Sequence, residues 1–244
     1  MSATQTETLT YVYAVTWAAA ADRPLGVGIH DAEVTTVEHG ELAALVSPVE
    51  PHQLRARRRD LLRHADVVQD AFERAPVLPL RFGTLLAGAD HVVSDVLAPR
   101  YDELVDALRR LDGLAEVTIR MYYREDDVLR ELLREEPRLA RLRGSAPPVQ
   151  LGEAVARTLA ARRDRDAAGV LAALRPHARD IVADEPRTTL EVVRAALLVE
   201  RSALAAVDRE VERLARARAS TTVFKYTGPL PPHHFVAVET SGAR

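Results

Sequence analysis

Runs and alternations of apolar residues predict the strands of this chain. Leu9–Trp17 is rich in β-branched and aromatic residues, which is typical of a buried strand. Val34–Glu38 and Leu42–Pro48 flank a turn at His39-Gly40-Glu41, and this pattern predicts a β-hairpin. The remaining expected strands are Ala115–Tyr123, Thr221–Thr227, His234–Glu239 and Val192–Glu200. A helix fits the last of these segments nearly as well, because of Ala195–Leu198.

Apolar residues that recur every three or four positions predict the helices. Gln53–Arg74 is amphipathic, and Asp90–Leu111 has the same period with Pro99 inside it, which should kink or split the helix. On the first helix we expect Asp60 and His64 to form a surface pair. The stripe facing the core is expected to contain Leu54, Leu61, Ala65, Val68 and Phe72. Further helices are expected at Arg124–Arg143 with a break at Pro137, at Leu151–Asp184 in two pieces, and after an N-cap at Ser202.

Two other segments separate these helices and strands. Val77–Leu86 is apolar with one proline and one glycine, so we expect an extended segment with a bend. Gly144–Gln150 has the composition of a loop.

In the expected helical segment Leu151–Asp184, the clearer apolar stripe runs through Val170, Leu174, Ala178 and Ile181.

The order of these elements predicts an α+β fold of two domains. Gly113 ends a helix and the composition changes after Tyr123, so the expected domains are residues 1–112 and 113–244. The second contains a strand, helices, a strand, a helix and two strands. We interpret this order as a modified ferredoxin-like fold with a helical insertion at about residues 125–184.

Composition and charge exclude several classes of protein. The 244 residues are 47% hydrophobic and 28% charged, which suits a globular chain with a sizeable core. The net charge of −3 argues against a nucleic-acid partner. No apolar run is long enough to span a bilayer, so we expect no membrane association and a cytoplasmic location. The absence of cysteine excludes thiolate chemistry and cysteine-ligated metals.

The search for catalytic motifs finds no convincing candidate. None of the serines lies in a nucleophile-elbow sequence, and no glycine-rich turn leads into a helix in the pattern that binds phosphate. The eight histidines include neither an i,i+4 pair nor a His-x-His strand pattern. The sequence therefore predicts a protein that is not an enzyme, with no catalytic residue, metal site or cofactor.

Two segments have features that a purely structural role does not fully explain. Arg81 lies among apolar residues in Pro76–Thr84, so we favour a buried guanidinium paired with an internal carboxylate; presentation to a partner is the alternative. In Tyr226–Phe235 three prolines stand within four residues. This segment is either a rigid connection between strands or a docking surface.

Taken with Tyr11-Val12-Tyr13 and Ala195–Glu200, the Val77–Gly83 (VLPLRFG) and Tyr226–Pro232 (YTGPLPP) motifs resemble the GvpF/GvpL family of gas vesicle proteins. The resemblance runs from about residue 9 to 239. The family often has aromatic residues where this chain has Leu230 and His233, and residues 124–190 carry no signature that matches.

The resemblance implies an accessory or minor structural protein of gas vesicles with two α+β domains, the second a modified ferredoxin fold. It implies association with the small hydrophobic shell subunit and with other accessory proteins during nucleation or assembly. We expect the second domain to make most of this contact. The candidate contact residues are Arg81, Phe82, Pro229, Pro231, Pro232 and Phe235. The alternative function is a small-molecule sensor or an enzyme built on a ferredoxin-like scaffold.

Overall fold

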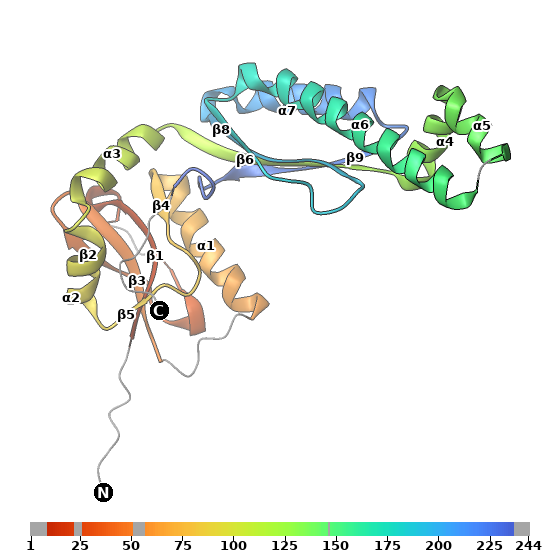
Figure 1. The fold of residues 1–244 in the computed structure, drawn as a ribbon. Coiled ribbons are helices and arrows are strands. Elements are labelled where there is room, and N and C mark those ends of the chain that lie inside the picture. Colours follow the sequence, from red (N-terminus) through yellow and green to blue (C-terminus); the bar gives the residue numbers. More distant parts are fainter. Residues whose placement is uncertain (1–8, 22–25, 51–56, 146, 237–244) are drawn as a thin grey trace, which may run out of the picture. The chain divides into compact units, whose positions relative to one another are not determined.

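The computed structural model describes residues 9–21, 26–50, 57–145 and 147–236 (Figure 1). The chain forms two compact units, one comprising Met1–Ala115 with Leu230–Arg244 and the other Glu116–Pro229. The division therefore falls three residues after the boundary expected at residue 112. The segment from Leu230 onward groups with the first unit, whereas the sequence prediction assigned it to the second.

The first unit is built on a sheet with a buried central strand, β1, which pairs with β3 and β4. The strand order is β2-β3-β1-β4, and β5 also pairs with β1. The strands are β1 (Leu9–Trp17), β2 (Thr35–His39), β3 (Leu42–Val49), β4 (Val77–Pro79) and β5 (Leu85–Leu86). The β2–β3 hairpin confirms the sequence prediction, and Gly40 adopts a φ of +58° in its turn.

The helices of the first unit follow the predicted order. They are α1 (Arg58–Arg74), α2 (Ala89–Val92) and α3 (Tyr101–Leu111), with a π-helical turn at Val93–Leu97 and 3₁₀ turns at Ala18–Ala20 and Ile29–Asp31. The predicted split at Pro99 is confirmed, because α3 begins at Tyr101. The expected start of the first helix at Gln53 lies outside the described residues.

The buried face of α1 differs from the predicted stripe. Val68 and Phe72 are buried as expected, but Ala65 is exposed and Leu61 is 45% exposed. Asp60 and His64 are buried instead of forming the expected surface pair, so that prediction is wrong. The reason is a hydrogen bond between His64 and Tyr11 on β1, which turns this polar side of the helix toward the sheet. Leu54 lies outside the described residues.

The second unit contains a four-stranded sheet in the order β7-β8-β6-β9. Its strands are β6 (Leu114–Tyr123, which begins at the end of the first unit), β7 (Asp180–Ala183), β8 (Glu191–Glu200) and β9 (Thr222–Leu230). Its helices are α4 (Glu125–Glu135), α5 (Pro137–Ser145), α6 (Pro148–Leu174) and α7 (Leu204–Ala217), with 3₁₀ turns at Arg175–His177 and Arg201–Ala203. Helices α6 and α7 lie along one face of the sheet (Figure 1).

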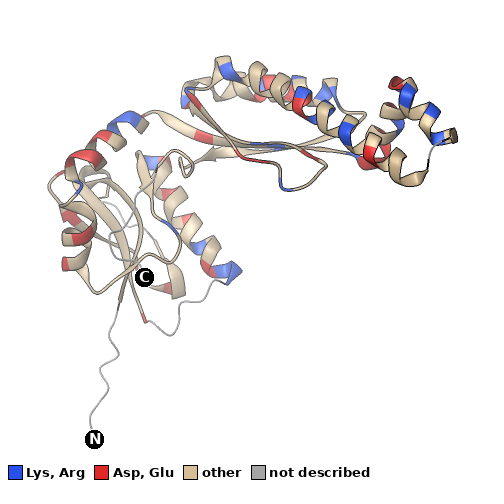
Figure 2. Cartoon of the chain, in the orientation of Figure 1, with Lys and Arg blue, Asp and Glu red and all other residues tan. Residues whose placement is uncertain are grey.

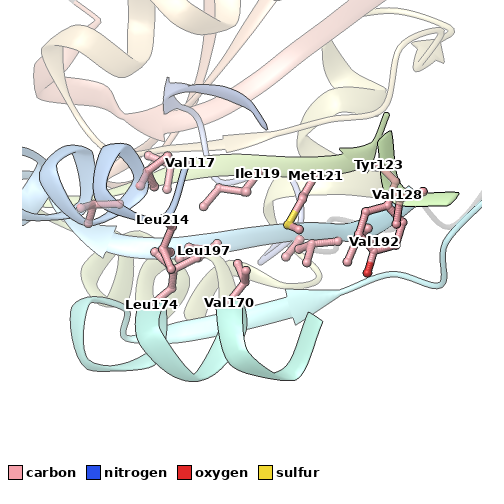
Figure 3. Packing of buried hydrophobic residues seen from close by; sticks show 14 of the residues in the cluster. Val117, Ile119, Met121, Tyr123, Val128, Val170, Leu174, Val192, Leu197 and Leu214 are labelled. Atoms are coloured by element: carbon pink, nitrogen blue, oxygen red, sulfur yellow. The ribbon is translucent and has the colours of Figure 1, made fainter. Parts of the chain in front are cut away.

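The core of the second unit lies between this sheet and its helices (Figure 3). Val117, Ile119 and Met121 alternate along β6 as predicted, and all three are fully buried. Together with Leu197 on the neighbouring strand β8, they pack against residues of the helices, including Leu174 on α6. Burying each of these side chains contributes about 1.5–3 kcal/mol.

Ion pairs hold the helices α4 and α6 together. Arg162, whose side chain is only 16% exposed, lies 2.6 Å from Glu131 and 3.2 Å from Glu135 on α4, and 3.7 Å from Asp166. The hydroxyl of Tyr123 donates to the same Asp166 at 2.6 Å. The charged residues of this unit are concentrated on its helices (Figure 2).

Several predicted boundaries in the second unit are wrong. The expected helix to Asp184 ends at Leu174, because Pro176 follows in a 3₁₀ turn and Ile181 belongs to β7, which pairs with β8. The expected loop at Gly144–Gln150 is largely helical. Ser202 is not an N-cap: α7 begins at Leu204 with Ala203 before it.

The C-terminal prediction also needs correction. Strand β9 does not stop at Thr227 but continues to Leu230, and Gly228 permits this with a φ of +155°. His234 begins no strand, because His233–Phe235 form a turn in which the N–H of Phe235 donates to the carbonyl of Pro232 at 3.1 Å. Residues 237–239 of the expected last strand lie outside the described residues.

Candidate functional site

The first motif is a turn fixed to β1 at both ends. The N–H of Leu80 donates to the carbonyl of Tyr13 at 2.9 Å, and the N–H of Val12 donates to the carbonyl of Thr84 at 3.0 Å. Between these anchors, the hydroxyl of Thr84 donates to the carbonyl of Arg81 at 2.8 Å and closes the turn. Gly83 has a φ of +91° there, a backbone conformation that favours glycine.

The turn is joined to α1 by a chain of hydrogen bonds through two buried side chains. The N–H of Gly83 donates to the hydroxyl of Tyr11 at 3.0 Å, and that hydroxyl lies 2.9 Å from Nδ1 of His64. His64 also hydrogen-bonds to the backbone of Leu80 and donates to its carbonyl, because this bond raises the pKa of His64 and the N–H of Leu80 is already donated to Tyr13. Nε2 therefore carries the proton, and Tyr11 donates to Nδ1.

Phe82 closes an aromatic cluster around His64. Its ring centroid lies 5.8 Å from His64 and 6.1 Å from Tyr11, both edge-on, and Tyr13 stacks on His64 at 5.7 Å. Tyr13 is fixed in turn by Ser47, at 2.8 Å from its hydroxyl. Four aromatic rings from β1, α1 and the turn thus pack as one group.

The cluster is neutral near pH 7. The pKa of His64 is lowered to about 4, chiefly by burial and also by the nearby charge of His233, while the hydrogen bond to Leu80 opposes the shift. Burial also raises the pKa of Tyr11. A neutral imidazole and a protonated phenol in the protein interior form a structural hydrogen bond rather than an acid–base pair ready to react.

Arg81 does not occupy the buried position that we favoured. Its side chain is exposed, and among the described residues it has no ion-pair partner. The turn instead directs Leu80 and Phe82 inward. The predicted internal salt bridge is wrong, and the alternative of an outward-facing guanidinium is the one consistent with this geometry.

The second motif spans both units. Tyr226 on β9 donates to Asp208 on α7 at 2.8 Å, and Pro229 is exposed near the end of the strand. Pro231 and Pro232 are buried and group with the first unit, and Phe235 is half-buried. Because the charge of His233 acts on His64, the end of this motif lies near the cluster that holds Phe82.

Sequence reasoning missed His64 and Asp60. The signal was available, because Asp60, His64, Val68 and Phe72 are spaced by four residues and share one helix face. The prediction placed polar residues on the solvent side of the helix. His64 can be buried because it hydrogen-bonds to Tyr11, which is 53 positions away in the sequence.

Strand β9 is the third feature of interest. Among the described residues it is the terminal strand of its sheet, with β6 on its inner side. Val223 and Lys225 alternate with less exposed neighbours and face solvent, and Thr227 is also exposed. Lys225, the only lysine of the chain, places its Nζ 5.5 Å from the ring centroid of Tyr122 on β6.

These features define a class of two-unit α+β proteins in which a Tyr-x-Tyr strand is held by a Pro-Leu-Arg-Phe-Gly turn. Residues 9–237 match the family model described as gas vesicle synthesis protein GvpL/GvpF. The chain belongs to this family, as the sequence motifs suggested, and it therefore has a gas vesicle accessory role. Within the part of the chain that the structure describes, no helix is long and apolar enough to cross a membrane.

Relatives of known name and structure agree with this assignment. The chain is 33% identical over 239 residues to gas vesicle protein F of Streptomyces sp. (strain CB03234), covering 93% of this chain and 99% of the relative. It is 32% identical to gas vesicle protein L of the same strain, over 66% of this chain and 62% of the relative. The crystal structure of GvpF from Anabaena sp. PCC7120 superposes with a TM-score of 0.84 at 20% identity, covering 95% of this chain and 99% of that one. That likeness shows the fold.

Proposed function

We propose that this chain binds the small hydrophobic shell subunit of gas vesicles directly and assists vesicle nucleation and assembly together with other accessory proteins. We place it in the cytoplasm, associated with the vesicle. The observation that carries the proposal is the edge strand β9 of the second unit. Membership of the family supports a partner among the gas vesicle proteins.

An edge strand offers a partner unpaired backbone groups. Within the described residues β9 pairs on one side only, so the N–H and C=O groups of its other side can accept an added strand. Val223 is 37% exposed and offers an apolar contact beside them. Pro229 lacks an N–H and limits this pairing surface to the residues before it.

We also propose that the second unit is a modified ferredoxin-like domain. Its strands follow the pattern strand, helices, strand, strand, helix, strand, and the sheet order β7-β8-β6-β9 places the first and third strands in the centre. The helices α4 and α5 are the insertion. This arrangement leaves the last strand, β9, at the edge.

The motif residues divide into two groups by exposure. Arg81 and Pro229 are exposed, and we propose that they contact the partner. The other four hold the segments that present these contacts. They are Phe82, Pro231, Pro232 and Phe235, which are buried or half-buried.

Photo-cross-linking from single cysteines tests the β9 contact. The natural chain has no cysteine, so Val223→Cys or Thr227→Cys places a benzophenone maleimide at one site without competing reaction. Arg209→Cys, exposed on α7, is the control. We expect cross-links to the shell subunit from residues 223 and 227 and none from 209. Equal yields from all three positions, or no cross-link from β9, would contradict the proposal.

A further inference from the structure

A cavity of about 410 Å³ lies beside the start of α1 in the first unit. Its charged and polar lining consists of His30, Asp31, Arg59, Asp60, Arg63 and Asp66. Neither sequence motif contributes to this lining. The cavity is therefore a second feature of the unit, independent of the β9 contact proposed above.

Two of the lining residues carry buried polar atoms that lack partners. Oδ2 of Asp60 and Nε2 of His30 are both shielded from solvent, and neither has a hydrogen bond within the described residues. The side chain of Asp60 is only 1% exposed. Its other oxygen, Oδ1, lies 3.3 Å from Nε of Arg59, whose own side chain is 66% exposed. A buried carboxylate with one free oxygen is unfavourable, and a ligand that donates to it would remove that cost.

The charges around the cavity indicate the sign of the ligand. Arg63 lies 3.6 Å from Asp31, and Arg59 lies beside Asp60, so each basic residue is matched by an acid. Asp66 has no ion-pair partner among the described residues and leaves one negative charge in excess. A ligand with a single positive charge balances the site.

The backbone fixes His30 at the cavity wall. His30 and Asp31 both have positive φ, 56° and 58°, which is unusual for two consecutive residues other than glycine. The adjoining N–H of Ile29 donates to the hydroxyl of Tyr13 at 2.8 Å, and the N–H of Gly28 donates to the carbonyl of Ala32 at 2.8 Å. These bonds anchor the turn to the core.

We propose that this cavity binds a cationic nitrogen group, the guanidinium of an arginine or the ammonium of a lysine. The bound cation donates hydrogen bonds to Oδ2 of Asp60 and to Nε2 of His30, and its charge balances Asp66. A guanidinium has several N–H donors in one plane and can make both bonds at once.

Thermal melts with small probes test this site directly. The Nα-acetylated amides of arginine and lysine, called arginine amide and lysine amide below, supply the two cations. The Nα-acetylated amide of citrulline, called citrulline amide, is an uncharged analogue of nearly the same shape as that of arginine. We expect millimolar arginine amide, lysine amide or both to raise the melting temperature, and citrulline amide to leave it unchanged. A response to arginine amide alone assigns a guanidinium site, and a response to both assigns a general cation site.

Single-residue variants test whether the rise in melting temperature depends on Asp60. Asp60→Asn removes the charge at nearly constant shape, and we expect it to weaken probe binding at least about tenfold, since a charge-assisted hydrogen bond is lost. Asp70→Asn, exposed on the same helix, should respond as the natural chain does. If Asp60→Asn does not fold, His30→Asn serves instead, because asparagine tolerates the left-handed backbone, and weaker binding is again expected. No response to either cation, an equal response to citrulline amide, or undiminished binding by a folded variant would overturn the proposal.

Discussion

The hydroxyl of Tyr11 on β1 lies 2.9 Å from Nδ1 of His64 on α1, within the core of the first unit. The same hydroxyl accepts the N–H of Gly83, and His64 binds the backbone of Leu80. One phenol and one imidazole therefore join the central strand, the long helix and the Val77–Thr84 turn. This explains why the turn motif and the Tyr-x-Tyr strand occur together.

Acid should destabilise the protein through His64. The unfolded imidazole has a pKa of about 6.5, whereas burial holds the folded one at about 4. The unfolded chain thus binds the proton first, so stability present above pH 6.5 is lost as the pH falls toward 4 and the loss then levels off. The gap corresponds to about 3 kcal/mol. Denaturant titrations between pH 7 and pH 4 should show this loss in the free energy of unfolding. In His64→Gln the free energy of unfolding should depend less on pH over the same range. His91→Gln, at an exposed site, should keep the natural profile; an unchanged profile for His64→Gln would contradict this assignment.

Tyr11→Phe should destabilise the first unit by about 2–3 kcal/mol. The change keeps the ring but leaves both the Gly83 N–H and His64 Nδ1 without their partner. Tyr101→Phe is the matched control, since the Tyr101 hydroxyl accepts the exposed N–H of Glu41 at 3.0 Å, and loss of this bond should cost less than about 1 kcal/mol. Chemical denaturation of both variants measures the difference. Equal losses of unfolding free energy in the two variants would contradict the prediction that the buried hydrogen bonds of Tyr11 stabilise the protein more than the exposed one of Tyr101.

Gly228→Ala should destabilise the second unit by about 2–4 kcal/mol. An added Cβ would lie 2.7 Å from Cγ1 of Val117 and 3.1 Å from the carbonyl oxygen of Glu116, at a φ that disfavours any side chain. Gly144→Ala on α5 meets nothing within 4 Å and should be neutral or slightly stabilising. Melting temperatures of the two variants measure this difference, and we expect a lower value for Gly228→Ala only. A neutral Gly228→Ala would mean that β9 does not approach β6 this closely.

Phe82→Ala should destabilise the protein, whereas Arg81→Ala should leave its stability almost unchanged. Phe82 packs on Tyr11 and His64, so its loss should cost about 1–3 kcal/mol. Arg81 is exposed, and its removal should change stability by no more than about 0.5 kcal/mol. A shell-subunit pull-down with Arg81→Ala then reports on contact alone. Retention of full binding by this folded variant would remove Arg81 from the proposed contact residues.

Much of the fold could be predicted from local patterns, and the errors have physical causes. Leu9–Trp17 is a long run of apolar and β-branched residues, which defines a strand without help from distant residues. Val192–Glu200 was compatible with a helix nearly as well, and the structure places it in strand β8. Ile181 was assigned to a helix because its spacing from Val170 and Leu174 continues the helical period across Pro176. Only its pairing with Leu197 makes it a strand residue.

The candidate site was less predictable than the fold. The motif segments were found from their composition, but the exposure of Arg81 depends on a turn closed by Thr84 and Gly83. The burial of Asp60 and His64 depends on elements far away in the sequence. Polar residues on a helix give no local sign that a distant strand supplies their hydrogen-bond partners.

The pairing of β9 with the shell subunit is the central claim, and hydrogen–deuterium exchange of the backbone amides measures it most directly. Exchange is followed for the natural chain alone and with the shell subunit present. We predict that amides of Thr222–Thr227 on β9 become protected when the subunit is present, while those of α7 in the same unit keep their rates. Unchanged exchange in β9, measured while the two proteins remain bound, would contradict the account.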